Sequence, residues 1–212
     1  MASPRAERRS GRPRARAALA GGARSRRGLS EDALSTLGPR AAIREALMTS
    51  KADFTEEEWT RLKRAPFLAG MAISLADPGG PIEAVKETAA TLKTVVGTAE
   101  KGGRGELVDA IAREVVEEAR QRQSPLAGFK PSKGATAGVE ILDELTAAQR
   151  IVLEKGTPED AAALRDWLLA VAQEAANAAK EGGFMGFKAE RVSEGEQRML
   201  DRLGEVLAAR PA

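Results

Sequence analysis

Apolar side chains recur at every third or fourth position along most of this chain, and this spacing limits the fold more than any other feature. One example is the segment 137–155, which carries Ile141, Leu145 and Val152. Such a period places the apolar groups on one face of an α-helix, whereas a half-buried strand alternates apolar and polar residues. No segment alternates in this way over the length of a strand. The sequence therefore predicts an all-α fold, a compact bundle of six to seven antiparallel helices.

Helix boundaries are marked by a hydroxyl residue followed three places later by an acidic residue, the pattern of an N-terminal capping box. The pairs are Thr55 with Glu58, Thr157 with Asp160, and Ser193 with Glu196. We expect Asp160 to be too short to close its box well. A break or kink is predicted at Pro66, because proline removes a backbone donor from a helix interior. Two segments, 97–104 and 124–136, are expected to be loose connections.

Residues 1–47 differ from the rest in composition and charge. The first 28 residues contain nine Arg and a single acid, and such a stretch cannot build a core. We therefore expect residues 1–47 to be a disordered Arg/Ala-rich extension with a short helix at about 30–47, and residues 48–212 to be a single all-helical domain. The extension resembles a transit peptide, would suit a basic arm for nucleic acid or anionic lipid, or lies upstream of a true start at Met48.

The charge of the predicted domain excludes some partners. Residues 1–47 have a net charge of +7, while the remainder carries 22 basic and 27 acidic groups, a net charge of −5. A mildly acidic body does not favour nucleic-acid binding, which needs clustered Lys and Arg on the folded surface. No run of about 18 apolar residues is present, so no membrane span is predicted. We expect a cytoplasmic protein with a protein partner or self-association.

Histidine and cysteine are absent from the whole chain. This removes the commonest general base, the thiolate nucleophile and most zinc and haem ligand sets. Carboxylates, lysines and hydroxyls remain, but they form no recognisable catalytic constellation. The prediction is therefore a domain that is not an enzyme and needs no cofactor. An enzyme that uses carboxylates in a cleft between helices is the third hypothesis.

Two segments carry large apolar residues outside the helical pattern. The segment 182–187 (GGFMGF) contains Phe184, Met185 and Phe187, and the segment 124–136 contains Phe129 beside two lysines. The glycines of the first segment are typical of a helix C-cap. The apolar residues either fold back as a lid over one end of the bundle or form an exposed anchor for a protein partner. These four residues are the candidate protein-contact site.

A different function follows from a resemblance. Residues 72–87 (AISLADPGGPIEAVKE) and residues 178–200, which end in RVSEGEQRML, each read as a helix, a turn and a helix with a Glu in its first turn. This arrangement is similar to the paired helix hairpins of tellurite-resistance TerB-like domains. The resemblance implies divalent-cation binding by Asp77, Glu83, Glu87, Glu181, Glu194 and Glu196. These acids would otherwise serve only to end helices and to interact with helix dipoles.

As a whole, the helices also resemble small uncharacterised all-helical bacterial proteins that begin near the Trp59 segment and close on a GGF loop before a final helix. That resemblance implies no function. The first hypothesis is thus a non-enzymatic helical domain that acts by protein association, and the alternative is a TerB-like domain that binds divalent cations.

Overall fold

The computed structural model describes residues 49–76, 81–132, 136–180 and 192–208, with the side chains of 81–85 and 179–180 excepted. These residues form a short 3-10 helix at Lys51–Asp53 and six α-helices, and they contain no strand. The all-α prediction is therefore confirmed. The predicted extension, 1–47, lies outside the described residues. The α-helices are α3 (Glu56–Ala76), α4 (Pro81–Lys101), α5 (Glu106–Arg120), α6 (Thr136–Lys155), α7 (Pro158–Lys180) and α8 (Glu194–Ala208).

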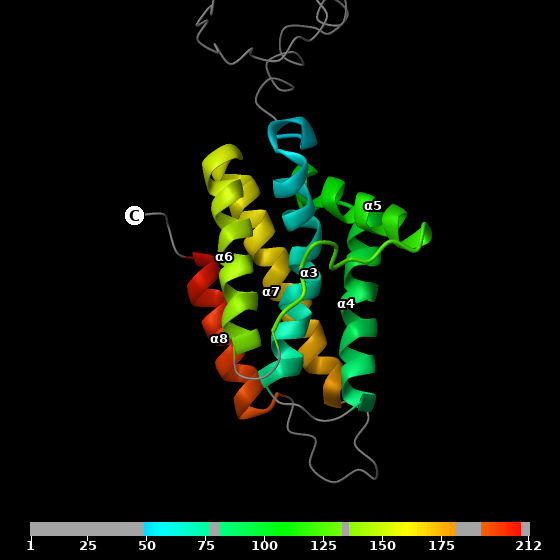
Figure 1. The fold of residues 1–212 in the computed structure, drawn as a ribbon, viewed down its shortest axis with the longest axis vertical. Coiled ribbons are helices and arrows are strands. Elements are labelled where there is room, and N and C mark those ends of the chain that lie inside the picture. The colour runs from blue at the N-terminus through cyan, green and yellow to red at the C-terminus, as the bar shows by residue number, and fades with distance from the viewer. Residues whose placement is uncertain (1–48, 77–80, 133–135, 181–191, 209–212) are drawn as a thin grey trace, which may run out of the picture. The chain divides into compact units, whose positions relative to one another are not determined.

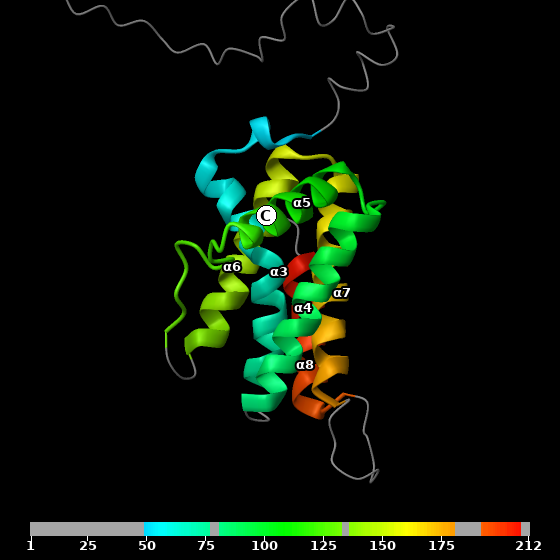
Figure 2. The same cartoon turned by 90° about the vertical axis from the view of Figure 1, so that its right-hand side faces the viewer.

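Helices α3 and α7 form the centre of the bundle. Each of them contacts the other and all four remaining helices. Five helices run roughly along one axis, while α5 crosses this direction near one end (Figures 1 and 2). The core consists of the apolar faces that the sequence pattern predicts, and its largest fully buried side chains include Trp59, Leu62, Ile111, Leu145, Trp167 and Leu203.

Small residues allow the central helices to approach closely. Ala172, Ala175 and Ala176 on α7 are all completely buried. On α3, a Cβ atom added to Gly70 would lie 2.2 Å from the hydroxyl oxygen of Thr91 on α4. No side chain larger than hydrogen fits at position 70 unless Thr91 moves, because real Cβ contacts do not become this short.

All three predicted capping boxes are present. The Thr55 amide donates to Glu58 Oε2 at 2.7 Å, and the Ser193 amide donates to Glu196 Oε2 at 2.8 Å. The Thr157 amide also reaches Asp160 Oδ2, at 3.1 Å, and Asp160 returns a bond from its own amide to the Thr157 hydroxyl at 3.1 Å. Asp160 therefore does close its box, contrary to expectation, although over a longer distance than the two glutamates.

Two local expectations differ from the structure. Helix α3 does not end at Pro66 but continues from Glu56 to Ala76 with the proline buried inside it. Helix α4 likewise continues through Gly97 to Lys101, so the first half of the segment 97–104 is helical. In both places, burial of the neighbouring apolar residues outweighs the local helix-breaking signal, as tertiary packing commonly does. Among the described helices, none is sufficiently long and apolar to cross a membrane.

Candidate ligand-binding pocket

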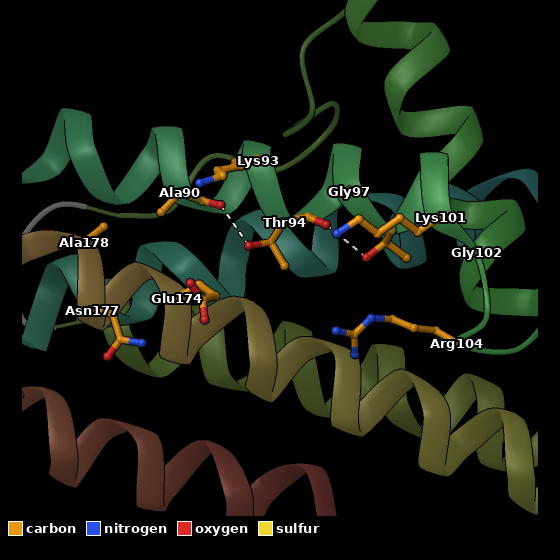
Figure 3. A pocket seen from close by; sticks show the side chains of 11 residues that line it. Ala90, Lys93, Thr94, Gly97, Lys101, Gly102, Arg104, Glu174, Asn177 and Ala178 are labelled. Atoms are coloured by element: carbon orange, nitrogen blue, oxygen red, sulfur yellow. Dashed lines mark hydrogen bonds between the residues drawn. The ribbon is translucent and has the colours of Figure 1, made fainter.

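A pocket of about 480 Å³ lies between α4, α7 and the turn that follows α4. Its size falls in the usual range for small-molecule sites. Figure 3 shows that α4 and α7 form its two long walls, and that Arg104 extends from the turn into the space between them. The pocket thus brings together residues of α4 and residues of α7 that are more than 70 positions apart in the chain.

The pocket exists because its walls carry small side chains. Ala90 and Gly97 on α4 and Ala178 on α7 line it. A Cβ atom added to Gly97 would meet no heavy atom within 4 Å, so the glycine faces open space. The hydroxyls of Thr94 and Thr98 also line the pocket, and each donates a 2.9 Å hydrogen bond to the carbonyl oxygen four residues earlier in α4. Each hydroxyl oxygen thus keeps acceptor capacity toward the cavity.

Three cationic residues line the pocket: Lys93, Lys101 and Arg104. Their side chains are exposed and form neither an ion pair nor a hydrogen bond within the part of the chain that the structure describes. Lys93 and Lys101 are eight residues apart on α4, which corresponds to about 12 Å along the helix axis at 1.5 Å per residue. The two lysines thus lie toward opposite ends of the α4 wall of the pocket.

The position of Arg104 is fixed by its backbone. It follows Gly102 and Gly103, whose φ angles of 62° and 88° suit glycine. The carboxylate of Asp109 on α5 accepts hydrogen bonds from the amides of Gly103 at 2.8 Å and Arg104 at 3.3 Å. Because Asp109 binds the backbone, it orients the turn without pairing with the Arg104 guanidinium.

The α7 wall supplies the complementary polar groups. Glu174 is the single acidic residue among the described residues that line the pocket, and its exposed carboxylate accepts no hydrogen bond there. Asn177 accepts a 3.2 Å hydrogen bond from Gln173 through its Oδ1, which leaves its amide hydrogens available. The three cations outnumber this one carboxylate, so the lining has a net positive charge.

Of the predicted contact residues, Phe129 is described and the structure gives it a packing role. Its half-buried ring packs against the core, and the guanidinium carbon of Arg64 lies 5.6 Å from the ring centroid. Arg64 also donates to the carbonyl oxygen of Ala127 at 2.9 Å. Phe184, Met185 and Phe187 lie outside the described residues.

Of the six residues implied by the TerB-like resemblance, the structure describes the side chains of Glu87, Glu194 and Glu196. Glu87 is buried on α4 and accepts a hydrogen bond from the Ser74 hydroxyl. Glu196 closes its capping box, and Glu194 forms an exposed ion pair with Arg198. Asp77, Glu181 and the Glu83 side chain lie outside the described part of the chain. Within that part, no group of three or more acidic residues could hold a metal ion.

The α4–α7 pocket is not among the sites predicted from the sequence. The available signal was the series Lys93, Gly97 and Lys101, in which a glycine lies between two lysines on one helix face. Periodicity alone does not show which neighbouring helix faces such a series, so the α7 residues could not be added. Comparisons of the chain with protein-family models, curated proteins and solved structures found no match.

Proposed function

We propose that this chain is a non-enzymatic helical domain that binds an anionic small molecule in the α4–α7 pocket. The observation that carries the proposal is that Lys93, Lys101 and Arg104 line one cavity without a partner for their charges among the described residues. Cations that share a cavity reinforce one another's potential and attract anions. Hydrogen bonds from ammonium or guanidinium groups to phosphate or carboxylate oxygens are also about twice as strong as neutral ones.

Binding of inorganic pyrophosphate, measured by calorimetry at constant ionic strength, tests this proposal. We expect Lys101→Gln and Arg104→Gln, at the turn end of the pocket, each to weaken binding by about tenfold, since a charge-assisted hydrogen bond contributes roughly 1.5–3 kcal/mol. Lys93→Gln, about two helical turns away on α4, should weaken binding less. Arg113→Gln is the matched control, because Arg113 is exposed on α5 and does not line the pocket. Unaltered affinity in the triple variant contradicts the proposal. Release of phosphate from the bound pyrophosphate would contradict its non-enzymatic part.

A pair of substitutions at Gly97 tests the location of the site. Gly97→Ala adds one methyl group to open space and should leave binding intact, whereas Gly97→Leu should fill the cavity and abolish binding. Thermal unfolding without ligand checks that both variants fold. If Gly97→Leu binds pyrophosphate normally, the anion is bound elsewhere.

Protein association, the first hypothesis from the sequence, is the second candidate function. It is favoured by a second cavity of about 290 Å³, whose apolar lining includes Phe67, Met71 and Leu126. This cavity suits one large apolar side chain of a partner protein, an arrangement common at binding hot spots. Phe184→Ser with Phe187→Ser should abolish capture of such a partner at unchanged stability. Met71→Glu should also abolish capture, and thermal unfolding must accompany it because Met71 packs against the core. Size-exclusion chromatography shows whether the partner is a second copy of the chain.

Divalent-cation binding and a cytoplasmic location remain predictions from the sequence alone. Calorimetric titration with calcium, magnesium and manganese tests the first, and an absence of heat and of thermal stabilisation would contradict it. Cell fractionation tests the second.

A further inference from the structure

The two ends of the α4–α7 pocket differ in charge. Lys101 and Arg104 lie at the end formed by the turn, and no acidic side chain lines the pocket there. At the other end Lys93 lies on α4, with Glu174 and Asn177 on α7 (Figure 3). One cation and one carboxylate balance at this second end. The pocket therefore offers a cationic end and an end that is polar but close to neutral.

The neutral end offers both kinds of hydrogen-bonding group. The Glu174 carboxylate is an acceptor only, and its two oxygens can accept hydrogen bonds from two neighbouring hydroxyl groups of a ligand. The free amide hydrogens of Asn177 and the ammonium group of Lys93 are donors. A hydroxyl group donates one hydrogen bond and accepts up to two, so a polyhydroxylated ligand uses this set fully.

The residues that line the pocket include no aromatic side chain in the described part of the chain. A nucleobase gains much of its binding energy by stacking on aromatic rings or on Arg, so this lining does not favour a base. A sugar or other polyol needs hydrogen bonds more than stacking.

We infer that the ligand of this pocket is a phosphorylated polyol of the sugar-phosphate class, with its phosphate held by Lys101 and Arg104 and its hydroxyl groups held by Glu174 and Asn177. The inference rests on the proposed anion-binding function and specifies which anion the site selects. The distance of about 12 Å between the Lys93 and Lys101 levels of α4 lets one ligand span both ends.

The experiment compares four probes on the full chain by calorimetry: inorganic phosphate, glucose 6-phosphate, glucose and adenosine monophosphate. Glucose 6-phosphate should bind at least tenfold more tightly than phosphate or adenosine monophosphate, and glucose alone should bind most weakly. Lys101→Gln and Arg104→Gln should each weaken the binding of both phosphate and glucose 6-phosphate.

Glu174→Gln separates the two ends by effects of opposite sign. It should weaken the binding of glucose 6-phosphate about tenfold, because one acceptor oxygen becomes a donor. The binding of phosphate should stay equal or become tighter, because a negative charge is lost from the pocket. Asn177→Ala should weaken glucose 6-phosphate alone. Glu205→Gln, an exposed change on α8, is the control. An unchanged melting temperature shows that each variant is folded.

The outcomes distinguish the two proposals. The sugar-phosphate inference is wrong, and anion binding stands, if glucose 6-phosphate binds no more tightly than phosphate. The same holds if the Glu174→Gln variant binds glucose 6-phosphate as tightly as the wild type does. Tighter binding of adenosine monophosphate also overturns the inference. If none of the anions binds, both proposals fail.

Discussion

At the residue scale, Glu114 on α5 joins three elements through one carboxylate. Its Oε1 accepts from Lys51 at 2.8 Å and from Lys63 at 3.2 Å, and its Oε2 accepts from the Trp59 indole at 2.9 Å. Burial alone would raise the pKa of Glu114, but the hydrogen bonds from Lys51, Trp59 and Lys63 outweigh it and hold the pKa below its usual 4.5. The ionised form is therefore the one that stabilises the fold.

Replacement of Glu114 by Gln should lower the free energy of unfolding by about 1–2 kcal/mol at pH 7, because an acceptor for Trp59 remains but two ion pairs are lost. A carboxyl group with a depressed pKa contributes stability above its unfolded pKa and loses it as the pH falls through its folded pKa. The difference between wild type and variant should therefore be constant above pH 6 and shrink below 4.5. Urea unfolding across pH measures it.

The control for this change is Glu117→Gln, which removes an exposed carboxylate from the same helix. Its effect should stay within about 0.5 kcal/mol at every pH, because exposed ion pairs contribute little. A Glu114→Gln difference that persists unchanged at low pH would show that the carboxylate charge is not what stabilises the contact.

At the scale of elements, two glycines inside helices have opposite roles. Gly70→Ala should destabilise the fold by about 1–3 kcal/mol, because its methyl group would collide with Thr91 where α3 and α4 meet. Gly97→Ala should stabilise it by up to about 1 kcal/mol, because alanine is the better helix former and the new methyl group meets no atom. Thermal unfolding of both variants measures the two changes in stability. If both changes have the same sign, the close packing at Gly70 is contradicted.

The segment between α5 and α6 is held by Arg64 of α3, which contacts the carbonyl oxygen of Ala127 and the ring of Phe129. Phe129→Ala should therefore cost about 1–2 kcal/mol and increase hydrogen exchange in residues 123–132. Lys130→Ala, an exposed neighbouring change, should do neither. If Phe129→Ala leaves stability and exchange unaltered, Phe129 is free to act as the predicted contact residue.

These elements also show what the sequence could predict. The capping boxes and apolar faces depend on residues three or four apart, so Ser193 with Glu196 and Ile141 with Leu145 are readable locally. The continuity of α3 through Pro66 depends on packing between distant segments, which local rules do not contain. The α4–α7 pocket is missed for the same reason: Glu174 and Lys93 line one cavity only after the helices assemble.

At the scale of the whole molecule, α7 connects the bundle because it contacts each of the other five described α-helices. Its residues Trp167, Leu168 and Val171 are completely buried. The removal of core volume from α7 should therefore weaken contacts with several helices at once, and the described bundle should lose its structure in one cooperative transition.

Leu168→Ala should lower the free energy of unfolding by about 2–5 kcal/mol, the usual cost of a cavity at a fully buried leucine. The chain contains two Trp and no Tyr. A Trp59→Phe background therefore leaves only the indole of Trp167 within α7, and a Trp167→Phe background leaves only that of Trp59 near the start of α3. In each background, Leu168→Ala should shift the fluorescence and circular dichroism transitions together. Asp166→Ala, an exposed change two residues away, should shift them little. Separate transitions for the two indoles would mean that α3 and α7 unfold independently, and the central role of α7 would then be wrong.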